Sequence, residues 1–308
     1  MVEHIWSLQN IQLSNACLTV GTFDGVHLGH QAILRSLRTG AHAANVQAVV
    51  LTFHPHPAVV FGKRPSASSL TTPEERSKLM DELGIDIVIT YPFDLQTART
   101  SAQDFIALLK DHLGFSWLGV GEDFALGNGR QGDVKFLSSL GEQYAYQLQV
   151  FSPIKLDGQV VSSSRIRLAL TDGDVQSAAR LLGRPYGLSG KVILGDGRGR
   201  TIGIPTANLL VNEGKLIPAS GVYACRAKVD NAIYVAAVNI GIRPTFDGDK
   251  TTSWVEAHLL DFTGDLYGQY ISLEFIERLR GEQRFVGVDE LLQQIHRDIQ
   301  ITRNIVSI

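Results

Sequence analysis

The chain has 308 residues and a formal net charge of −3. This length favours two domains, and the slight negative charge argues against a nucleic-acid-binding surface. No apolar stretch is long enough to cross a bilayer and no export leader opens the chain, so we expect no membrane partner. Cys17 and Cys225 fit neither a disulfide framework nor a zinc site, which favours a reducing cytoplasm.

Residues 18–31 predict a short strand, a glycine turn and a helix start. Gly21 and Gly25 allow a tight turn, and His27 and His30 lie three apart on one face of the helix. Free N–H groups and the dipole at a helix start favour an anion, and two imidazoles can donate to phosphoryl oxygens. The alternative is a polar first turn that happens to carry histidines, but the surrounding glycines favour a ligand site.

The next 120 residues alternate between strand and helix patterns. Strands are predicted at 48–53, 85–89, 117–120 and 147–151, and helices begin after Thr72, after Ser101 and near residue 134. This order predicts a doubly wound parallel sheet, in which ligands bind beyond the carboxyl ends of the strands. His54 and His56 at one such end are weaker candidates, and the glycine-rich loop 121–133 suggests a ligand, with a plain mobile loop as the alternative.

Residues 162–167 open another helix, which ends near residue 172. One serine is explained by helix capping alone. A phosphate site would explain the others, because hydroxyls and N–H groups at a helix start bind oxygen, and an arginine one turn inside offers a bidentate fork.

The composition changes after Leu182. Six short β-rich runs follow with turn residues between them, which predicts a small antiparallel barrel or sandwich, and one amphipathic helix is expected at 288–301. We therefore place the domain boundary between residues 182 and 183. The runs are 190–194, 206–211, 222–229, 233–239, 254–260 and 270–275.

Two sets of polar residues in the second half suggest chemistry. Thr206 and Asn208 alternate onto one face of a strand, and such oxygen ligands suit a Mg²⁺ ion that is otherwise held by water and nucleotide phosphates. Glu256 lies in an apolar strand, where it is either a general base towards a substrate hydroxyl or a residue that simply faces solvent. We expect the kinase-like triplet His296-Arg297-Asp298 to be a surface coincidence, and the sequence contains no P-loop or dinucleotide fingerprint.

Several of these segments resemble one enzyme family. The run Gly21-Thr22-Phe23-Asp24-Gly25-Val26-His27-Leu28-Gly29-His30 is similar to the G-x-F-D-G-x-H-x-G-H signature of bacterial bifunctional riboflavin kinase/FAD synthetases. Residues 162–167 are similar to the family's S-S-T-x-x-R element, with Ser164 in place of threonine. Asp123-Phe124 matches its Asp-Phe loop, but Ala125-Leu126 follow where bulkier residues are expected.

The second half also resembles this family, in its riboflavin kinase module. Residues 203–208 are similar to its G-x-P-T-A-N element, with Ile204 where phenylalanine is expected, and the segments 239–246 and 254–262 also look like it. The module's catalytic glutamate matches Glu256, and its metal ligands match Thr206 and Asn208.

The resemblance implies two enzymes in one chain. Residues 1–182 would form a Rossmann-like FAD synthetase (FMN adenylyltransferase) domain, and residues 183–308 a β-barrel riboflavin kinase domain with a terminal helix. The implied substrates are ATP, riboflavin and FMN, the product of the second reaction is FAD, and Mg²⁺ accompanies ATP. The implied catalytic residues are Glu256, His27 and His30, the implied ATP site consists of Gly21, Phe23, Gly25, His27, His30, Ser163, Ser164 and Arg167, and the implied flavin contacts are Asp123 and Phe124.

Two other functions remain open from the sequence. One is a single-activity nucleotidyltransferase with a flavin-binding barrel, and the other is a catalytically silent flavin or nucleotide sensor. The oligomeric state is not predicted.

Overall fold

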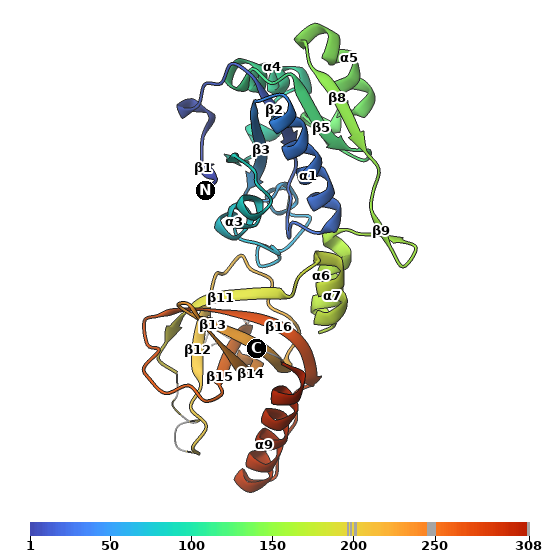
Figure 1. Ribbon diagram of the computed structural model, residues 1–308. Coiled ribbons are helices and arrows are strands. Elements are labelled where there is room, and N and C mark those ends of the chain that lie inside the picture. Colours follow the sequence, from blue (N-terminus) through green and yellow to red (C-terminus); the bar gives the residue numbers. More distant parts are fainter. Residues whose placement is uncertain (196, 198, 200–201, 245–250, 307–308) are drawn as a thin grey trace. The chain divides into compact units, whose positions relative to one another are not determined.

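A computed structural model describes residues 1–195, 197, 199, 202–244 and 251–306 (Figure 1). The backbone packs into two compact units, Met1–Ser163 and Ser164–Ile308. No helix in the described part of the chain is long and apolar enough to cross a membrane.

The first unit is built on a six-stranded parallel sheet, which confirms the predicted doubly wound architecture. The strand order is β1-β4-β3-β2-β5-β8. The chain proceeds outward from β2 through β3 to β4 and then returns to the other side of β2 with β5, so the sheet reverses its order between β2 and β5. Ligands of such sheets bind beyond the carboxyl ends of the strands at this reversal. The strands are β1 (Glu3–Ile5), β2 (Ala16–Val20), β3 (Gln47–His54), β4 (Ile87–Pro92), β5 (Trp117–Gly121) and β8 (Gln147–Phe151).

Helices cover both faces of this sheet because alternate strand residues point to opposite sides. Leu34 and Leu37 of α1 (Leu28–Ala43) and Met80 of α3 (Pro73–Glu82) pack on one face. Leu109 of α4 (Ala102–Leu113) and Leu137 of α5 (Val134–Tyr144) pack on the other. The capping signals are confirmed, since Thr72 and Glu75 form a reciprocal capping box and the Ser101 hydroxyl accepts the Asp104 N–H.

Several short elements in the first unit lack a sequence signal strong enough to predict. The edge strand β1 has only three residues, and the predicted loop 121–133 contains a small antiparallel ribbon. They are β6 (Ala125–Leu126), β7 (Gly132–Asp133), β9 (Lys155–Leu156), β10 (Gln159–Val160), α2 (Pro57–Val60) and the 3-10 helices Leu8–Asn10, Thr97–Arg99 and Asn128–Arg130.

The second unit is a closed six-stranded antiparallel barrel in the order β11-β12-β15-β14-β13-β16, which confirms the predicted β-barrel. Each predicted β-rich run lies within or largely overlaps one of its strands. They are β11 (Tyr186–Ile193), β12 (Ala207–Val211), β13 (Gly221–Val229), β14 (Ala232–Pro244), β15 (Thr251–Leu259) and β16 (Tyr270–Arg280).

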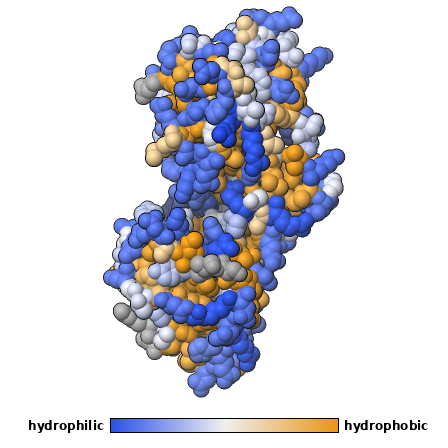
Figure 2. All heavy atoms as spheres, in the orientation of Figure 1, coloured by the Kyte–Doolittle hydropathy of each residue, from blue (hydrophilic) through white to orange (hydrophobic). Residues whose placement is uncertain are grey.

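The terminal helix α9 (Val288–Ile305) is predicted, but its buried side is not purely apolar. Its visible surface in Figure 2 is mainly hydrophilic. Its fully buried residues are Asp298 and Thr302. The apolar side that the sequence predicts is only half-buried and consists of Leu291, Leu292, Ile295 and Ile299. The expectation that Asp298 lies at the surface is wrong, because Arg280 of the barrel binds its carboxylate through Nε at 3.0 Å and Nη2 at 2.8 Å.

The helices α6 (Ser163–Thr171) and α7 (Val175–Leu182) pack with the barrel. Leu181 and Leu182 are buried, and Arg278 of β16 donates through Nη1 to the Asp172 carbonyl at 3.2 Å. The Ala219 N–H bonds the Leu170 carbonyl at 3.0 Å. A fragment that begins at the predicted boundary, residue 183, would lack both helices and these two hydrogen bonds.

We expect a fragment of residues 164–308 to be more stable than a fragment of residues 183–308. The shorter fragment loses the burial of at least four apolar side chains of α7, which on area arguments costs on the order of 5 kcal/mol. Denaturant unfolding of the two purified fragments measures this difference. Equal midpoints would show that α6 and α7 add nothing to the barrel.

Candidate active sites

The first candidate site is the turn between β2 and α1, beside the reversal of the sheet. Phe23, Gly25 and Val26 all have left-handed backbone conformations, with φ of 46°, 88° and 41°, and the Val26 N–H bonds the Phe23 carbonyl at 3.0 Å. Left-handed φ is uncommon for a β-branched residue and persists where the surrounding structure holds it. The turn is therefore tightly specified.

This turn brings the two predicted histidines together. The rings of His27 and His30 stack with their centroids 3.6 Å apart and an interplanar angle of 17°. His27 is the N-cap of α1, and its Nδ1 accepts the His30 N–H at 3.4 Å. This bond makes Nδ1 of His27 an acceptor, so the neutral ring carries its proton on Nε2 and can donate from there.

Glycines in this segment accommodate the protein's own rings. A Cβ atom on Gly29 would lie 3.2 Å from the His27 ring, and one on Gly21 would lie 3.0 Å from the Phe23 ring. Phe23 in turn meets the His30 ring edge-to-face at 5.1 Å. The sequence pattern indicated that the glycines around the histidines favour a ligand site; in the structure, the lack of a side chain at Gly29 also makes room for the His27 ring.

Burial lowers the pKa of His30 well below its ordinary value, with smaller contributions in the same direction from His27 and Arg76. Its Nδ1 is shielded and has no hydrogen-bond partner among the described residues, so a proton added there would be unsatisfied. His30 is therefore neutral at pH 7 and would act as a hydrogen-bonding group rather than as a cation.

The lowered pKa of His30 predicts that the first unit loses stability in acid. Below about pH 6.5 an unfolded histidine gains a proton that folded His30 does not, so the free energy of unfolding falls by up to about 1.4 kcal/mol per pH unit. We expect His30→Gln to reduce this slope between pH 7 and pH 5 in denaturant unfolding of the full chain. His42→Gln, at an exposed position of α1, is the control, and identical slopes in wild type and His30→Gln would contradict the prediction.

The predicted serine and arginine contacts divide between the two units. Ser163 is the last residue of the first unit. Its hydroxyl donates to the Asp24 carbonyl at 2.8 Å and so connects residue 163 to the histidine turn. Ser164 and Arg167 lie on α6, in the second unit. Their contribution to ATP binding stays a prediction.

The loop 121–133 lies on the other side of the sheet reversal. Phe124 packs against the core, and the Asp123 carbonyl accepts a bond from Arg130 Nη2 at 2.9 Å. Gly127 and Gly132 pack on Ala102 at the start of α4, where a Cβ atom would approach it within 2.6 Å. The glycines that suggested a ligand loop thus have a packing role, and flavin binding by Asp123 and Phe124 stays a prediction.

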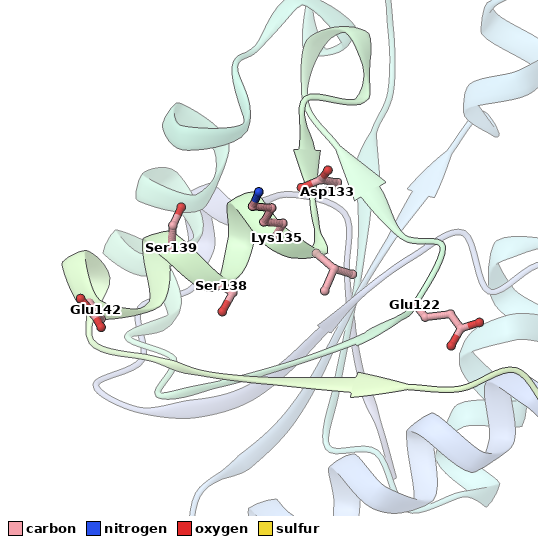
Figure 3. A pocket seen from close by; sticks show the side chains of 7 residues that line it. Glu122, Asp133, Lys135, Ser138, Ser139 and Glu142 are labelled. Atoms are coloured by element: carbon pink, nitrogen blue, oxygen red, sulfur yellow. The ribbon is translucent and has the colours of Figure 1, made fainter.

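An open polar pocket lies next to this loop (Figure 3). Three carboxylates and only one ammonium line it, so its charge opposes a phosphate. It is therefore a poor candidate for the ATP site, and the histidine turn is the better one. Its lining residues are Glu122, Asp133, Val134, Lys135, Ser138, Ser139 and Glu142.

The second candidate site lies on the barrel, where β12, β15 and β14 are neighbours. Glu256 is in register with Asn208 on one side and with Asn239 on the other. The indole Nε1 of Trp254 donates to Asn208 Oδ1 at 2.5 Å and to Glu256 Oε1 at 2.9 Å. The predicted amide and carboxylate are thus held together by a tryptophan that the sequence analysis did not single out.

Backbone segments pack closely around the predicted metal ligands. A Cβ atom on Gly195 would lie 2.0 Å from the Asn208 amide, and one on Gly199 would lie 3.3 Å from Thr206 Oγ1. His258 Nδ1 is 2.7 Å from the Pro205 carbonyl, which fixes the residue before Thr206. Thr206 immediately precedes β12. Residues 196, 198, 200 and 201, which come before the 203–208 motif, lie outside the described residues, as do residues 245 and 246 of the segment 239–246.

Among the described residues, no group of three or more His, Cys, Asp and Glu side chains could hold a metal ion. Thr206 and Asn208 instead offer a hydroxyl and an amide oxygen, and Asn208 is in register with Glu256. A small number of neutral oxygen ligands fits Mg²⁺, because this ion keeps much of its water and binds substrate phosphates.

The two weaker site candidates of the first unit, His54 and His56, have contacts of their own within the protein. His56 Nδ1 caps α2 by accepting the Ala58 N–H at 3.0 Å, and the His54 ring meets the Trp6 ring edge-to-face.

Family models match both halves of the chain. One described as FAD synthetase matches residues 9–165, and one described as riboflavin kinase matches residues 182–306. The curated protein "Bifunctional riboflavin kinase/FMN adenylyltransferase" of Escherichia coli (strain K12) is 37% identical over 300 residues, which cover 97% of this chain and 95% of that protein. The protein of the same name from Bacillus subtilis (strain 168) is 36% identical over 301 residues, with the same coverage of each.

A solved structure is similar over nearly the whole chain. It is titled "Crystal Structure of Macrolide-efflux Protein from Streptococcus pneumoniae", is 30% identical and has a TM-score of 0.89, with 98% of this chain and 99% of that chain covered. Its title names a transport activity, whereas the family models and the curated relatives name two transferases.

Proposed function

Because this chain belongs to the family of bifunctional riboflavin kinase/FMN adenylyltransferases, we propose that its stacked His27–His30 pair serves adenylyl transfer and that Glu256 serves riboflavin phosphorylation. The chain is a transferase with both activities, in agreement with the sequence-based prediction. The proposal concerns which residues perform each reaction. The observation that carries it is that each unit has its own cluster of the required polar groups.

In the first unit, a phosphate oxygen of FMN attacks the α-phosphorus of ATP. The bond from this phosphorus to the oxygen that bridges to the β-phosphorus breaks, and pyrophosphate leaves with that oxygen. Negative charge develops on the oxygens around the α-phosphorus, where preorganised donors stabilise it. His27 would donate through Nε2–H, neutral His30 would lie beside it, and Gly21, Phe23 and Gly25 would shape the turn around the phosphates.

In the second unit, the terminal hydroxyl of the riboflavin side chain attacks the γ-phosphorus of ATP. Glu256 would take the hydroxyl proton, the bond from the γ-phosphorus to its bridging oxygen breaks, and ADP leaves. Trp254 donates a hydrogen bond to Glu256 Oε1, which restricts the orientation of the carboxylate. Thr206 and Asn208 would hold Mg²⁺, which when bound neutralises charge on the phosphates.

The remaining assignments are part of the same proposal. Ser163, Ser164 and Arg167 would contact ATP phosphates, and Asp123 and Phe124 would contact FMN. A cytoplasmic location suits two buried free thiols, Cys17 and Cys225, and a chain that works on ATP.

One assay tests the bifunctional assignment. The purified full chain is incubated with riboflavin, ATP and Mg²⁺, and FMN and FAD are separated by chromatography. We expect FMN to appear first and FAD to follow. FAD formation from added FMN without phosphorylation of riboflavin would instead indicate a single-activity nucleotidyltransferase, and ATP binding with no product would indicate a sensor.

A further inference from the structure

The turn that carries His27 and His30 is held in place by the buried carboxylate of Asp24. Asp24 is fully buried, and its Oδ1 accepts the backbone N–H groups of Leu70 at 2.9 Å and Thr71 at 3.1 Å. The next residue, Gly25, donates its own N–H to the Thr71 hydroxyl at 3.0 Å. Asp24 belongs to the same motif as the histidines, and its carboxylate connects the turn to the segment before α3.

A buried arginine on α3 connects these groups. Arg76 is 3% exposed, and its Nη2 lies 3.9 Å from Asp24 Oδ1 and 3.4 Å from the Thr71 carbonyl. Its Nη1 donates to the hydroxyl of Thr52 on β3 at 2.8 Å. That hydroxyl donates in turn to the Thr22 carbonyl at 2.9 Å. The guanidinium thus holds the two residues that flank Phe23: Thr22 through the Thr52 hydroxyl, and Asp24 through its charge.

Stability alone is a weak explanation for this arrangement. Removing a guanidinium and a carboxylate from water has a large desolvation cost, and well-packed apolar residues often serve a core equally well. The network instead fixes the backbone on both sides of Phe23, at the beginning of the left-handed segment that leads to His27.

We propose that Arg76 and Thr52 are positioning residues for FMN adenylylation, because they fix Thr22 and Asp24 and thereby place the His27–His30 pair. This inference rests on the proposed role of that pair. Neither residue touches the reacting atoms. Positioning matters in such reactions because a displacement of about 1 Å can lower the rate about a hundredfold.

The test uses the hydroxyl of Thr52. Thr52→Val keeps the shape of the side chain but removes the relay to Thr22, and Thr52→Ser keeps the relay. Thr19→Val is the matched control, because Thr19 is another fully buried threonine of the same sheet, and its hydroxyl bonds the Gly119 carbonyl at 2.7 Å. The full chain of each variant is assayed for both activities at a temperature below its unfolding transition.

We expect Thr52→Val to lower kcat for FMN adenylylation about tenfold or more, with a smaller change in KM for ATP. Thr52→Ser and Thr19→Val should stay within about threefold of wild type. Riboflavin phosphorylation should be the same in all variants. A folded Thr52→Val with wild-type kcat, or equal losses in Thr52→Val and Thr19→Val, would overturn the inference.

Arg76→Lys provides an independent test that does not depend on the folding of Thr52→Val. Lysine keeps the positive charge near Asp24 but lacks the fork that reaches Thr52 and Thr71 together. A comparable loss of kcat supports the inference, and a wild-type kcat contradicts it. Failure of the proposed function would be recognised separately, because adenylylation would then survive His27→Ala and His30→Ala in an otherwise active protein.

Discussion

Replacement of His27 or His30 by alanine is expected to abolish most FAD formation from FMN while FMN formation from riboflavin persists. Both imidazoles stack at the start of α1, in the first unit only. Loss of one donor to developing charge typically costs about 3 kcal/mol, which corresponds to a rate loss of about 10²-fold. The measurement is the initial rate of each reaction with the full-length variants, with FMN and FAD separated by chromatography.

His42→Ala is the control for effects on α1, because His42 is an exposed residue of the last turn of the same helix. It should leave both rates unchanged. Thermal unfolding shows whether each variant is folded at the assay temperature. Wild-type rates of FAD formation in folded His27→Ala and His30→Ala would refute the assignment of the site.

The elements that could be predicted from the sequence are those with local signals. The capping box of Thr72 and Glu75 connects residues three apart, and each barrel strand has its own apolar run between turn residues. The same holds for His27 and His30, which meet because a helix start places residues three apart side by side.

The features that escaped prediction depend on distant parts of the chain. Arginine on a helix usually faces solvent, but Arg76 is buried because Thr52, 24 residues earlier, accepts its hydrogen bond. Asp298 is likewise buried because Arg280 of the barrel binds it. The three-residue strand β1 exists because it adds to the edge of β4, and no pattern of its own sequence indicates this pairing.

The barrel site has residues that local motifs predict and contacts that depend on distant parts of the chain. Asn208 and Glu256 were predicted separately, from their motifs, but the distance of 48 positions between them says nothing about contact. Strand register makes them neighbours, and Trp254 bonds both. A tryptophan two residues before a glutamate in a strand shares its face, so this partner could have been found from the period of two.

Glu256→Gln is expected to lower riboflavin phosphorylation by about 10²-fold or more, in line with the contribution of a general base, and to leave FMN adenylylation unchanged. The amide oxygen of glutamine can still accept the Trp254 Nε1–H, which lies 2.9 Å from Glu256 Oε1, so the fold around the site is kept. What the variant lacks is a group that can take the proton of the attacking hydroxyl. The measurement is kcat for FMN formation with saturating riboflavin and ATP.

Glu274→Gln is the matched control, because Glu274 is an exposed carboxylate of the same barrel, 3.6 Å from Arg226 on the adjacent strand. It should retain wild-type phosphorylation, since an exposed ion pair contributes little to stability and this one lies on β13 and β16, which do not pair with β12 or β15. If Glu256→Gln kept its activity, deprotonation by Glu256 would not limit the reaction. If both activities fell together in Glu256→Gln, a role of Glu256 in phosphorylation alone would be wrong, because the adenylylation step is assigned to the His27–His30 pair of the other unit.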